Sequence, residues 1–547
     1  MIVRLKCFFC GLLALSLQLS ILYFAPPLAA ELLADRGQQE YAPAEDINIP
    51  PKASDISVNS LSSQNLNEST KTVGSFVAPE KQNLADLIGM SEVSVFADVD
   101  GQFSKVINAI EVIDNNLATQ IADANLLESI RAGRGFSRES LAALERTAQA
   151  KAQTGQAFAL LLPSLSMRAS YGYEKSEPSV EINENGDLVA SNSHDRTDYA
   201  VTLRQPLFDL PSYRDWRRRQ VIEQARGDYY RASDADAYVA AVNAYLSLLS
   251  SRLQIDMTRN FENQLSDLYS YIEKRANAGA ASISDMARVK ARSQETMSTR
   301  LEQESAHTAA GIEFVRLTNL VPQKVRIPVL DDVGAHLLPE SFERAVPAAM
   351  KTNPEIASLA AEVQAANMDI STARGRFLPR VDAELSDSYS QGAGGDTSSA
   401  GQRDKRALIV LNWSLFSGGS DYHYSAEHTA RHKELQYRLD DQRRRVIQAL
   451  SANYAALATT RERINSGYQE MKSISTAAEA MSKRMLSGNQ SLLDLLDVYD
   501  RFYQVRTRLL NLHILEMSTV TQLVRLVQGS PDPATKVDAE SIIISRR

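Results

Sequence analysis

Two aspartates, Asp494 and Asp497, lie three residues apart in the segment SGNQSLLDLLDVYD, among leucines that a folded protein would bury. Side chains three residues apart on a helix lie on the same face, so the two carboxylates would point the same way. The segment begins around Gly488 and Gln490 and is typical of a helix start, where a negative charge contributes about 0.3–1 kcal/mol of stability. The pair is therefore either a helix-start charge or a functional acidic site.

The same arrangement occurs a second time, in the segment NAGAASISDMARVKARSQ. Gly279 is followed by a short polar turn that contains Ser284, and Asp285 stands three residues after a serine, as in a capping box. Gly279 and Gly488 are 209 residues apart, and so are Asp285 and Asp494. The chain therefore contains an internal repeat.

The composition favours long helices. The chain has 547 residues, few glycines and prolines, and many Ala, Leu, Gln, Arg and Glu residues, which favour helix formation. Its net charge of -8, without a basic patch, argues against nucleic acid as a partner. Beyond the N-terminus no segment reaches the ~18 consecutive apolar residues of a transmembrane helix, so any membrane insertion would have to use strands.

The N-terminal residues have the pattern of a secretory signal peptide. MIVRLK is a short basic segment, CFFCGLLALSLQLSILYFA is apolar, and PPLAA provides small residues for cleavage near Ala30, so residues 1–30 are predicted to be removed. An uncleaved membrane anchor is the alternative. Both cysteines, Cys7 and Cys10, lie in this segment, and the mature protein would have none. Residues 31–97, whose first part is rich in Ser, Asn and Pro, are predicted to form a disordered extension.

Four segments alternate between apolar and polar residues, with the period of two that is typical of strands. In the first segment Leu165, Met167 and Ala169 alternate with serines and an arginine, and in the third Val381 and Ala383 alternate with acidic residues. The four segments are LLPSLSMRASYGYE (161–174), TDYAVTLRQPLF (197–208), FLPRVDAELSDSYS (377–390) and RALIVLNWSLF (406–416). Each repeat therefore contains one hairpin of strands.

A very long helix is predicted after each hairpin. Residues 214–275 contain no proline and one glycine, and residues 422–486 have a similar pattern. Apolar residues with heptad spacing form one seam and a second seam lies beside it, so the first long helix would pack on two neighbours, as in a ring of helices. The seams are Ala232, Ala235, Val239, Val242, Leu246, Leu249 and Leu253, and Ala237, Ala241, Ala244 and Leu248. At ~1.5 Å per residue, about 65 residues would be roughly 100 Å long.

The order of these elements divides the chain. We predict a first helix, hairpin and helix repeat at 98–320 and a second at 341–528. A proline-bearing, irregular linker at 321–340 would join them, and the polar residues 529–547 would form a disordered tail.

This duplicated order of elements resembles the TolC-like outer membrane efflux and secretion channels. The motifs that carry the resemblance are TNPEI before the second hairpin, LRQPLF and LNWSLFSGG at strand ends, and SGNQSLLDLLDV at a helix start, all within residues 100–528. The form LLDLLDV resembles family members that serve type I secretion. The resemblance implies an α+β fold, with a long α-helical coiled-coil barrel in the periplasm and four transmembrane β-strands per chain.

The closure of the strands supports the same architecture. Four strands are too few to close a barrel, and open strand edges cannot face lipid. Two chains would provide eight strands, whose interior is filled by side chains, whereas three would provide twelve strands and an open lumen. The family is trimeric, so the resemblance implies a homotrimer with a 12-stranded β-barrel in the outer membrane of a Gram-negative bacterium and a large periplasmic portion.

The resemblance implies a passive export channel. Its partners would be outer membrane lipid, a periplasmic adaptor (membrane fusion) protein and an inner-membrane transporter of the ABC or RND type, and its role would be type I protein secretion. Two alternatives are the outer membrane component of a multidrug or small-molecule efflux pump and a soluble periplasmic coiled-coil scaffold. The alternating hairpins argue against a scaffold, which has no use for strands of membrane-spanning length.

Both turns between the long helices would lie at the periplasmic tip, and they comprise Gly279, Ser284 and Asp285 in the first copy and Gly488 and Gln490 in the second. A helix of roughly 100 Å would separate each turn from the strands. The resemblance places this tip at the entrance of the pore.

The resemblance also implies a role for the aspartates. In the family, an acidic pair at the start of the last long helix constricts the periplasmic entrance, and Asp494 and Asp497 match that pair. In a trimer each would form a ring of three carboxylates, which favours cations. Asp285 matches the family's latch acid, but its partner positions here hold Gln490 and Met485. The latch of the closed state is therefore expected to be altered or absent.

The sequence does not support other chemistry. His428 and His432 in AEHTARHKE have the i, i+4 spacing of a metal pair, but the glutamates are not placed as a zinc protease needs, so a solvated helix face is expected. The segment QGAGGD lacks the lysine of a phosphate-binding loop, and no Gly-Xaa-Ser-Xaa-Gly motif occurs. We expect no enzyme activity, no metal and no cofactor.

Overall fold

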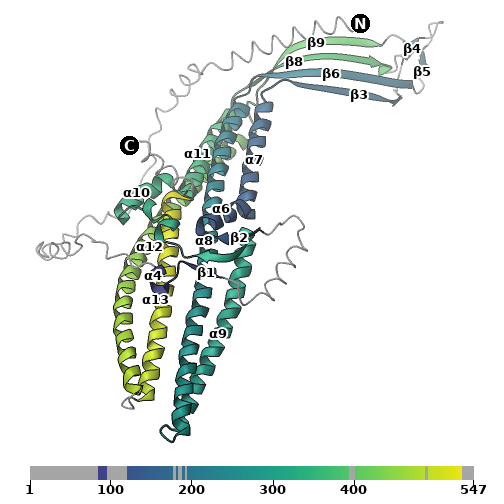
Figure 1. The fold of residues 1–547 in the computed structure, drawn as a ribbon. Coiled ribbons are helices and arrows are strands. Elements are labelled where there is room, and N and C mark those ends of the chain that lie inside the picture. The colour runs from purple at the N-terminus through teal and green to yellow at the C-terminus, as the bar shows by residue number, and fades with distance from the viewer. Residues whose placement is uncertain are drawn as a thin grey trace, which may run out of the picture. The chain divides into compact units, whose positions relative to one another are not determined.

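The computed structural model describes most of both repeats (Figure 1). The described residues are 84–94, 120–175, 180–182, 188–190, 194–393, 401–486 and 491–531. Four predictions lie wholly or partly outside them: the signal peptide at 1–30, the extension over 31–83, the second tip turn with Gly488 and Gln490, and the tail beyond residue 531.

The two copies of the repeat contain matching elements. The first copy contains α6 (Leu126–Phe136), α7 (Arg138–Ala159), β3 (Ser164–Glu174), β6 (His194–Phe208), α8 (Leu210–Asn277) and α9 (Ile283–Thr318), with a small hairpin of β4 (Val180–Ile182) and β5 (Leu188–Ala190). The second copy contains α10 (Phe342–Thr352), α11 (Pro354–Gly375), β8 (Arg380–Gln391), β9 (Gln402–Asn412), α12 (Ser420–Leu486) and α13 (Leu492–Gln528). The first residues of α9 and α13, Ile283 and Leu492, are 209 positions apart, which confirms the repeat.

The four long strands form one antiparallel sheet in the order β3-β6-β8-β9, so the two hairpins lie side by side (Figure 1). Leu203 of β6 pairs with Leu385 of β8, and this pairing joins the two copies. The four predicted strands are confirmed. In the described part of the chain, β3 and β9 each pair with one strand only and therefore form the edges.

Helix α8 packs on α7, α9, α11 and α13. Its first turn is capped by Asp209, whose carboxylate accepts a hydrogen bond from the backbone N–H of Ser212 at 3.0 Å. Pro211 fits this first turn, where a backbone N–H would have no helical partner. Every residue of the two predicted seams is buried. Burying a leucine contributes roughly 1.5–3 kcal/mol relative to leaving it exposed, so the seams hold the helices together.

The predicted lengths of the long helices are also confirmed. Helix α8 has 68 residues and α12 has 67, which corresponds to roughly 100 Å each. The sheet and the turn at Gly279 therefore lie at opposite ends of α8. None of the described helices combines the length and the apolar character that crossing a bilayer requires.

A second, smaller sheet has the strand order β1-β7-β2. It is formed by β1 (Glu92–Ser94), β7 (Leu320–Arg326) and β2 (Gln120–Ala124), and the short helix α4 (Leu84–Ile88) precedes it. The predicted disordered extension over 31–97 is therefore wrong for residues 84–94, where Leu84, Leu87 and Val93 are buried in the core. A helix of five residues and a strand of three are too short to show a period in the sequence.

Candidate functional site

Asp494 and Asp497 lie at the start of α13 with their side chains in solvent. Asp497 forms an ion pair with Arg501, one turn further along, at 3.0 Å between Oδ2 and Nε, and its side chain is 60% exposed. Leu492 and Leu495, which alternate with the acids, are buried instead. The helix start therefore has two faces: the leucines anchor it, and the carboxylates are presented outward.

The leucines belong to a small apolar cluster that joins the two helical hairpins near their tips. It contains Leu268 and Ile272 of α8, Val289 of α9, Met485 of α12, and Leu492 and Leu495 of α13. The hydroxyl of Tyr271 adds a hydrogen bond to the carbonyl of Met485 at 3.3 Å. This cluster fixes the position of the two aspartates relative to the first copy.

The tip turn of the first copy carries one aspartate and an arginine, where the second copy carries two aspartates. Gly279 has a φ of 75°, a left-handed conformation that favours glycine. Asp285 is half-buried and lies 3.9 Å from Arg288. The expected capping box forms only in part, because the serine before the helix accepts its hydrogen bond from the N–H of Ser284, at 3.2 Å, and not from that of Asp285.

One of the two positions expected to alter the latch lies within the described residues. Met485, one of the two positions that match the family's latch partners, is buried in the apolar cluster. Its thioether side chain therefore offers Asp285 neither a positive charge nor a hydroxyl. The other position, Gln490, lies outside the described residues.

A second set of contacts between the hairpins lies further from the tip. Arg292 of α9 forms an ion pair with Asp500 of α13. The rings of Phe261 in α8 and Tyr503 in α13 stack with centroids 4.8 Å apart, and the Tyr503 hydroxyl lies 2.8 Å from the hydroxyl of Thr258. The sequence does not predict these contacts, because partners 208 or more residues apart leave no periodic signal.

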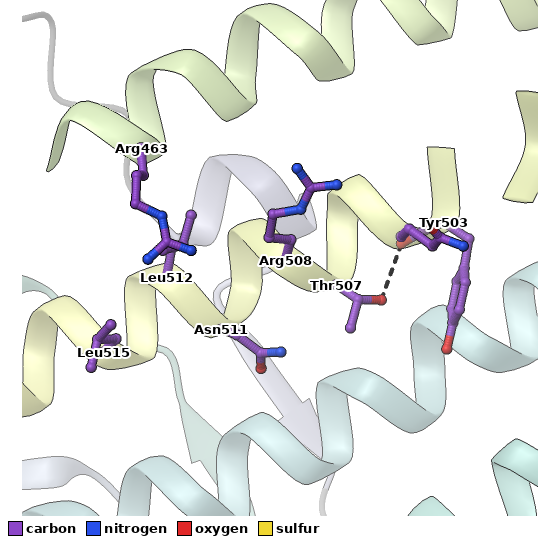
Figure 2. A pocket seen from close by; sticks show the side chains of 8 residues that line it. Arg463, Tyr503, Thr507, Arg508, Asn511, Leu512 and Leu515 are labelled. Atoms are coloured by element: carbon purple, nitrogen blue, oxygen red, sulfur yellow. Dashed lines mark hydrogen bonds between the residues drawn. The ribbon is translucent and has the colours of Figure 1, made fainter. Parts of the chain in front are cut away.

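Tyr503 also borders a groove between α12 and α13, with a volume of about 410 Å³ (Figure 2). The groove is lined by Arg463, Tyr503, Gln504, Thr507, Arg508, Asn511, Leu512 and Leu515. Arg508 donates a hydrogen bond to Glu470 at 3.2 Å, and Asn511 accepts one from Gln254 at 3.0 Å. The side chains that line the groove provide hydrogen bonds, and each arginine adds one positive charge. They include no nucleophile with a neighbouring base.

A buried polar group connects α12 and α13. His513 is 4% exposed, and its Nε2 lies 3.0 Å from the hydroxyl of Tyr468. Burial lowers the pKa of His513, and the nearby Glu516 opposes this shift. Glu516 is itself buried and accepts a hydrogen bond from Arg461 at 2.8 Å.

The histidines with metal-like spacing have other neighbours. The ring of His428 packs edge-on against that of Tyr424, with centroids 4.4 Å apart. Over the ranges that the structure describes, His, Cys, Asp and Glu residues form no group of three or more that could hold a metal ion.

The chain is similar to known outer membrane proteins. Residues 345–528 match the outer membrane efflux proteins. The chain is 24% identical over 359 residues to the alkaline protease secretion protein AprF of Pseudomonas aeruginosa, with 64% of this chain and 73% of AprF covered. It is also 24% identical over 380 residues to the outer membrane protein TolC of Salmonella enteritidis, with 64% of this chain and 71% of TolC covered. The chain is thus similar to the TolC-like outer membrane efflux and secretion proteins.

The fold of this chain agrees with solved structures. CusC, described in a study of its folding and transmembrane channel formation, superposes with a TM-score of 0.65 at 15% identity. The match covers 75% of this chain and 94% of CusC. The long helices and the strands thus have the arrangement of a known channel fold.

Proposed function

We propose that this protein is the outer membrane channel of a tripartite export system, in which three copies form a passive conduit to the cell exterior. The observation that carries the proposal is the open sheet, whose edge strands β3 and β9 each pair with one strand in the described part of the chain. Backbone groups without partners cannot face lipid. Further copies at both edges would close the sheet, and three copies would give twelve strands around a lumen.

The two faces of the sheet differ as a membrane barrel requires. The strand register aligns polar residues on one face, among them Ser166, Arg168, Thr202, Arg204, Glu384, Ser386 and Arg406. It aligns apolar residues on the other, among them Leu165, Met167, Val201, Leu203, Val381, Leu385, Ile409 and Leu411. Met167 and Ile409, in the two edge strands, are 70% and 76% exposed. The polar face would line the lumen, and the apolar face would contact lipid.

The hairpins α8/α9 and α12/α13 would form the periplasmic tube. In a trimer the exposed Asp494 and Asp497 would each form a ring of three carboxylates at the entrance, which favours cations. A periplasmic adaptor and an inner-membrane transporter would deliver the substrate to this end.

Protein export is the favoured task, because AprF is named for the secretion of a protease. Small-molecule efflux is the second candidate, because the matching family is named for efflux. Deleting the gene in its host separates the two. Loss of a secreted protein with unchanged drug sensitivity would support export, and increased drug sensitivity with an unchanged secretome would support efflux.

Closure of the sheet can be tested by cross-linking. Both natural cysteines, Cys7 and Cys10, lie in the predicted signal peptide, so introduced cysteines can be labelled selectively. In Met167→Cys/Ile409→Cys, a short bismaleimide should join β3 of one copy to β9 of the next. Outer membrane fractions should then contain covalent dimers and trimers and no larger species. The single variant Met167→Cys, which lacks the cysteine in β9, is the control. A soluble monomer released by osmotic shock would refute the proposal.

A further inference from the structure

Large apolar side chains are exposed where the helices meet the sheet. We call these residues the junction collar: Phe158, Leu160 and Leu162 at the end of α7, Phe377 and Leu378 between α11 and β8, and Trp413, Leu415 and Phe416 after β9. Leu415 and Phe416 are 79% and 86% exposed. Apolar residues this exposed, at three connections between helices and strands, mark a surface that contacts something other than water.

Three arginines lie near the collar and have no carboxylate partner among the residues that the structure describes. Arg214 and Arg217 lie in the first two turns of α8, and Arg374 lies in the last turn of α11. Arg214 donates a hydrogen bond to the carbonyl of Ser371, and Arg217 donates one to Gln220 at 3.2 Å. Within the described ranges, none of the three arginines forms an ion pair with a carboxylate.

The carboxylates nearby are used by other arginines. Asp215 pairs with Arg218 at 2.5 Å, and Arg218 also lies 3.1 Å from Asp369. Asp209 pairs with Arg380 at 3.2 Å. Burial and the neighbouring charge of Arg374 lower the pKa of Arg214. This end of the helices thus has excess positive charge in a protein whose net charge is -8.

Aromatic residues lie among these arginines. The Trp216 ring lies 5.4 Å from that of Phe158, and the guanidinium of Arg217 lies 6.0 Å from the Trp216 ring. Trp413 donates its indole N–H to the carbonyl of Phe377 at 3.0 Å. Tryptophans and arginines next to exposed apolar side chains are typical of the boundary between lipid and water.

We propose that Arg217 and Arg374, supported by Arg214, bind the phosphate groups of anionic phospholipids, while the apolar residues of the collar contact the acyl chains below. The inference rests on the proposed function, because it requires that the sheet is inserted in a membrane. The partner is a lipid and not a free anion, since the arginines are adjacent to apolar side chains that free phosphate would leave in water. Arg217 and Arg374 are exposed and can reach the headgroups.

The test uses the full-length protein purified in detergent and titrated with phosphatidylglycerol, with bound lipid counted by native mass spectrometry. Arg217→Gln/Arg374→Gln should weaken phosphatidylglycerol binding by about tenfold, because each arginine contributes to anionic lipid attraction. Arg217→Lys/Arg374→Lys keeps the charges and should retain most of the binding. The control Arg438→Gln/Arg445→Gln removes two exposed arginines that pair with Glu434 and Asp441 on their own helix, and it should bind as the wild type does.

Several results would overturn the proposal. These are equal phosphatidylglycerol binding by the Gln variant and the wild type, equal binding of phosphatidylcholine, and full competition by inorganic phosphate. Loss of the trimer with unchanged lipid binding would show that the arginines pair with a neighbouring copy. If the Gln variant does not fold, the Lys variant decides: its binding should weaken at 1 M salt, and salt-independent binding would contradict the proposal. A protein absent from membrane fractions would instead refute the proposed function itself.

Discussion

Helices α8 and α12 have the same place in the two copies of the repeat and very different surroundings. Helix α8 packs on α7, α9, α11 and α13, whereas α12 packs on α10, α11 and α13. Val239, Leu246 and Leu253 of α8 are buried, and the residues 209 positions later in α12 are Gln448, Ala455 and Glu462. Helices α8 and α12 thus have nearly the same length, but their side chains differ because each helix packs on different neighbours.

The exposed surface of α12 also indicates how copies of the chain would pack together. Large residues of α12 are exposed in the single chain, including Tyr422 and Tyr437 at 70% and 74%. A helix that carries exposed tyrosines along its outer side has more apolar surface than a solvated helix needs. We therefore expect neighbouring copies to cover α12, whereas α8 is already covered within its own chain.

The largest expected effect is in the core of α8. Leu249 is 1% exposed, so Leu249→Ala should lower the free energy of unfolding by about 2–5 kcal/mol, because it removes buried methyl groups and leaves a cavity. The measurement is urea unfolding of the refolded protein in detergent. The matched control is Ala458→Ser at the equivalent, exposed position of α12, which should change stability by less than about 0.5 kcal/mol. Equal effects at the two sites would contradict the comparison.

A pair of tyrosines gives a finer comparison. Tyr245 of α8 and Tyr454 of α12 are 209 residues apart, and each hydroxyl donates to a backbone carbonyl, of Arg326 at 2.5 Å and of Pro339 at 2.8 Å. Tyr245 is fully buried, Tyr454 is partly exposed, and burial raises the pKa of both. Tyr245→Phe should cost about 1–3 kcal/mol, because it removes a hydrogen bond made by a fully buried side chain, and Tyr454→Phe about 0.5–1.5 kcal/mol. Thermal unfolding of the two variants would rank them, and the reverse order would be inconsistent with the burial of α8.

A pH effect distinguishes the returning helices. His513 of α13 is buried with a lowered pKa, whereas the residue 209 positions earlier, Glu304, pairs with Arg259 and Arg300 at 3.1 and 2.8 Å. Because the unfolded state binds the His513 proton more tightly, its contribution to stability is present above the unfolded pKa of about 6.5 and decreases as the pH falls below it. The slope from this residue is at most about 1.4 kcal/mol per pH unit.

His513→Gln keeps a hydrogen-bonding group beside Tyr468 and removes the titration. Between pH 8 and pH 5 the melting temperature of the wild type should therefore fall by more than that of the variant. A wild-type slope that persists in His513→Gln would assign the pH dependence to other groups.

The sequence predicted the parts of the fold that repeat with a period. The seam of α8, with Leu246 and Leu249, and the four alternating strands each cover several periods, so their buried faces could be identified. The pairing of Arg292 with Asp500 and the burial of His513 beside Tyr468 depend on the register between helices distant in sequence, which no periodicity encodes. The spacing of leucines and acids alone predicts that Asp494 and Asp497 share one face of a helix start, but the face of an assembly that they line depends on contacts between copies, which no spacing encodes.

The last prediction concerns the charges at the two tips. Asp285 and Asp494 are equivalent in the repeat, but the residue three positions later is Arg288 in the first copy and Asp497 in the second. Asp497→Arg makes the second tip resemble the first and should change stability by only about 0.3–1 kcal/mol, because the site is an exposed helix start. In planar bilayers the cation-to-anion permeability ratio should fall, since the ring at position 497 would lose three negative charges and gain three positive ones. Arg288→Asp gives the first copy an acidic pair and serves as the control, because the proposed rings arise from α13 alone. If Asp497→Arg conducts with unchanged selectivity, or Arg288→Asp changes it more, the acids of α13 are only helix-start charges and the entrance is formed by other residues.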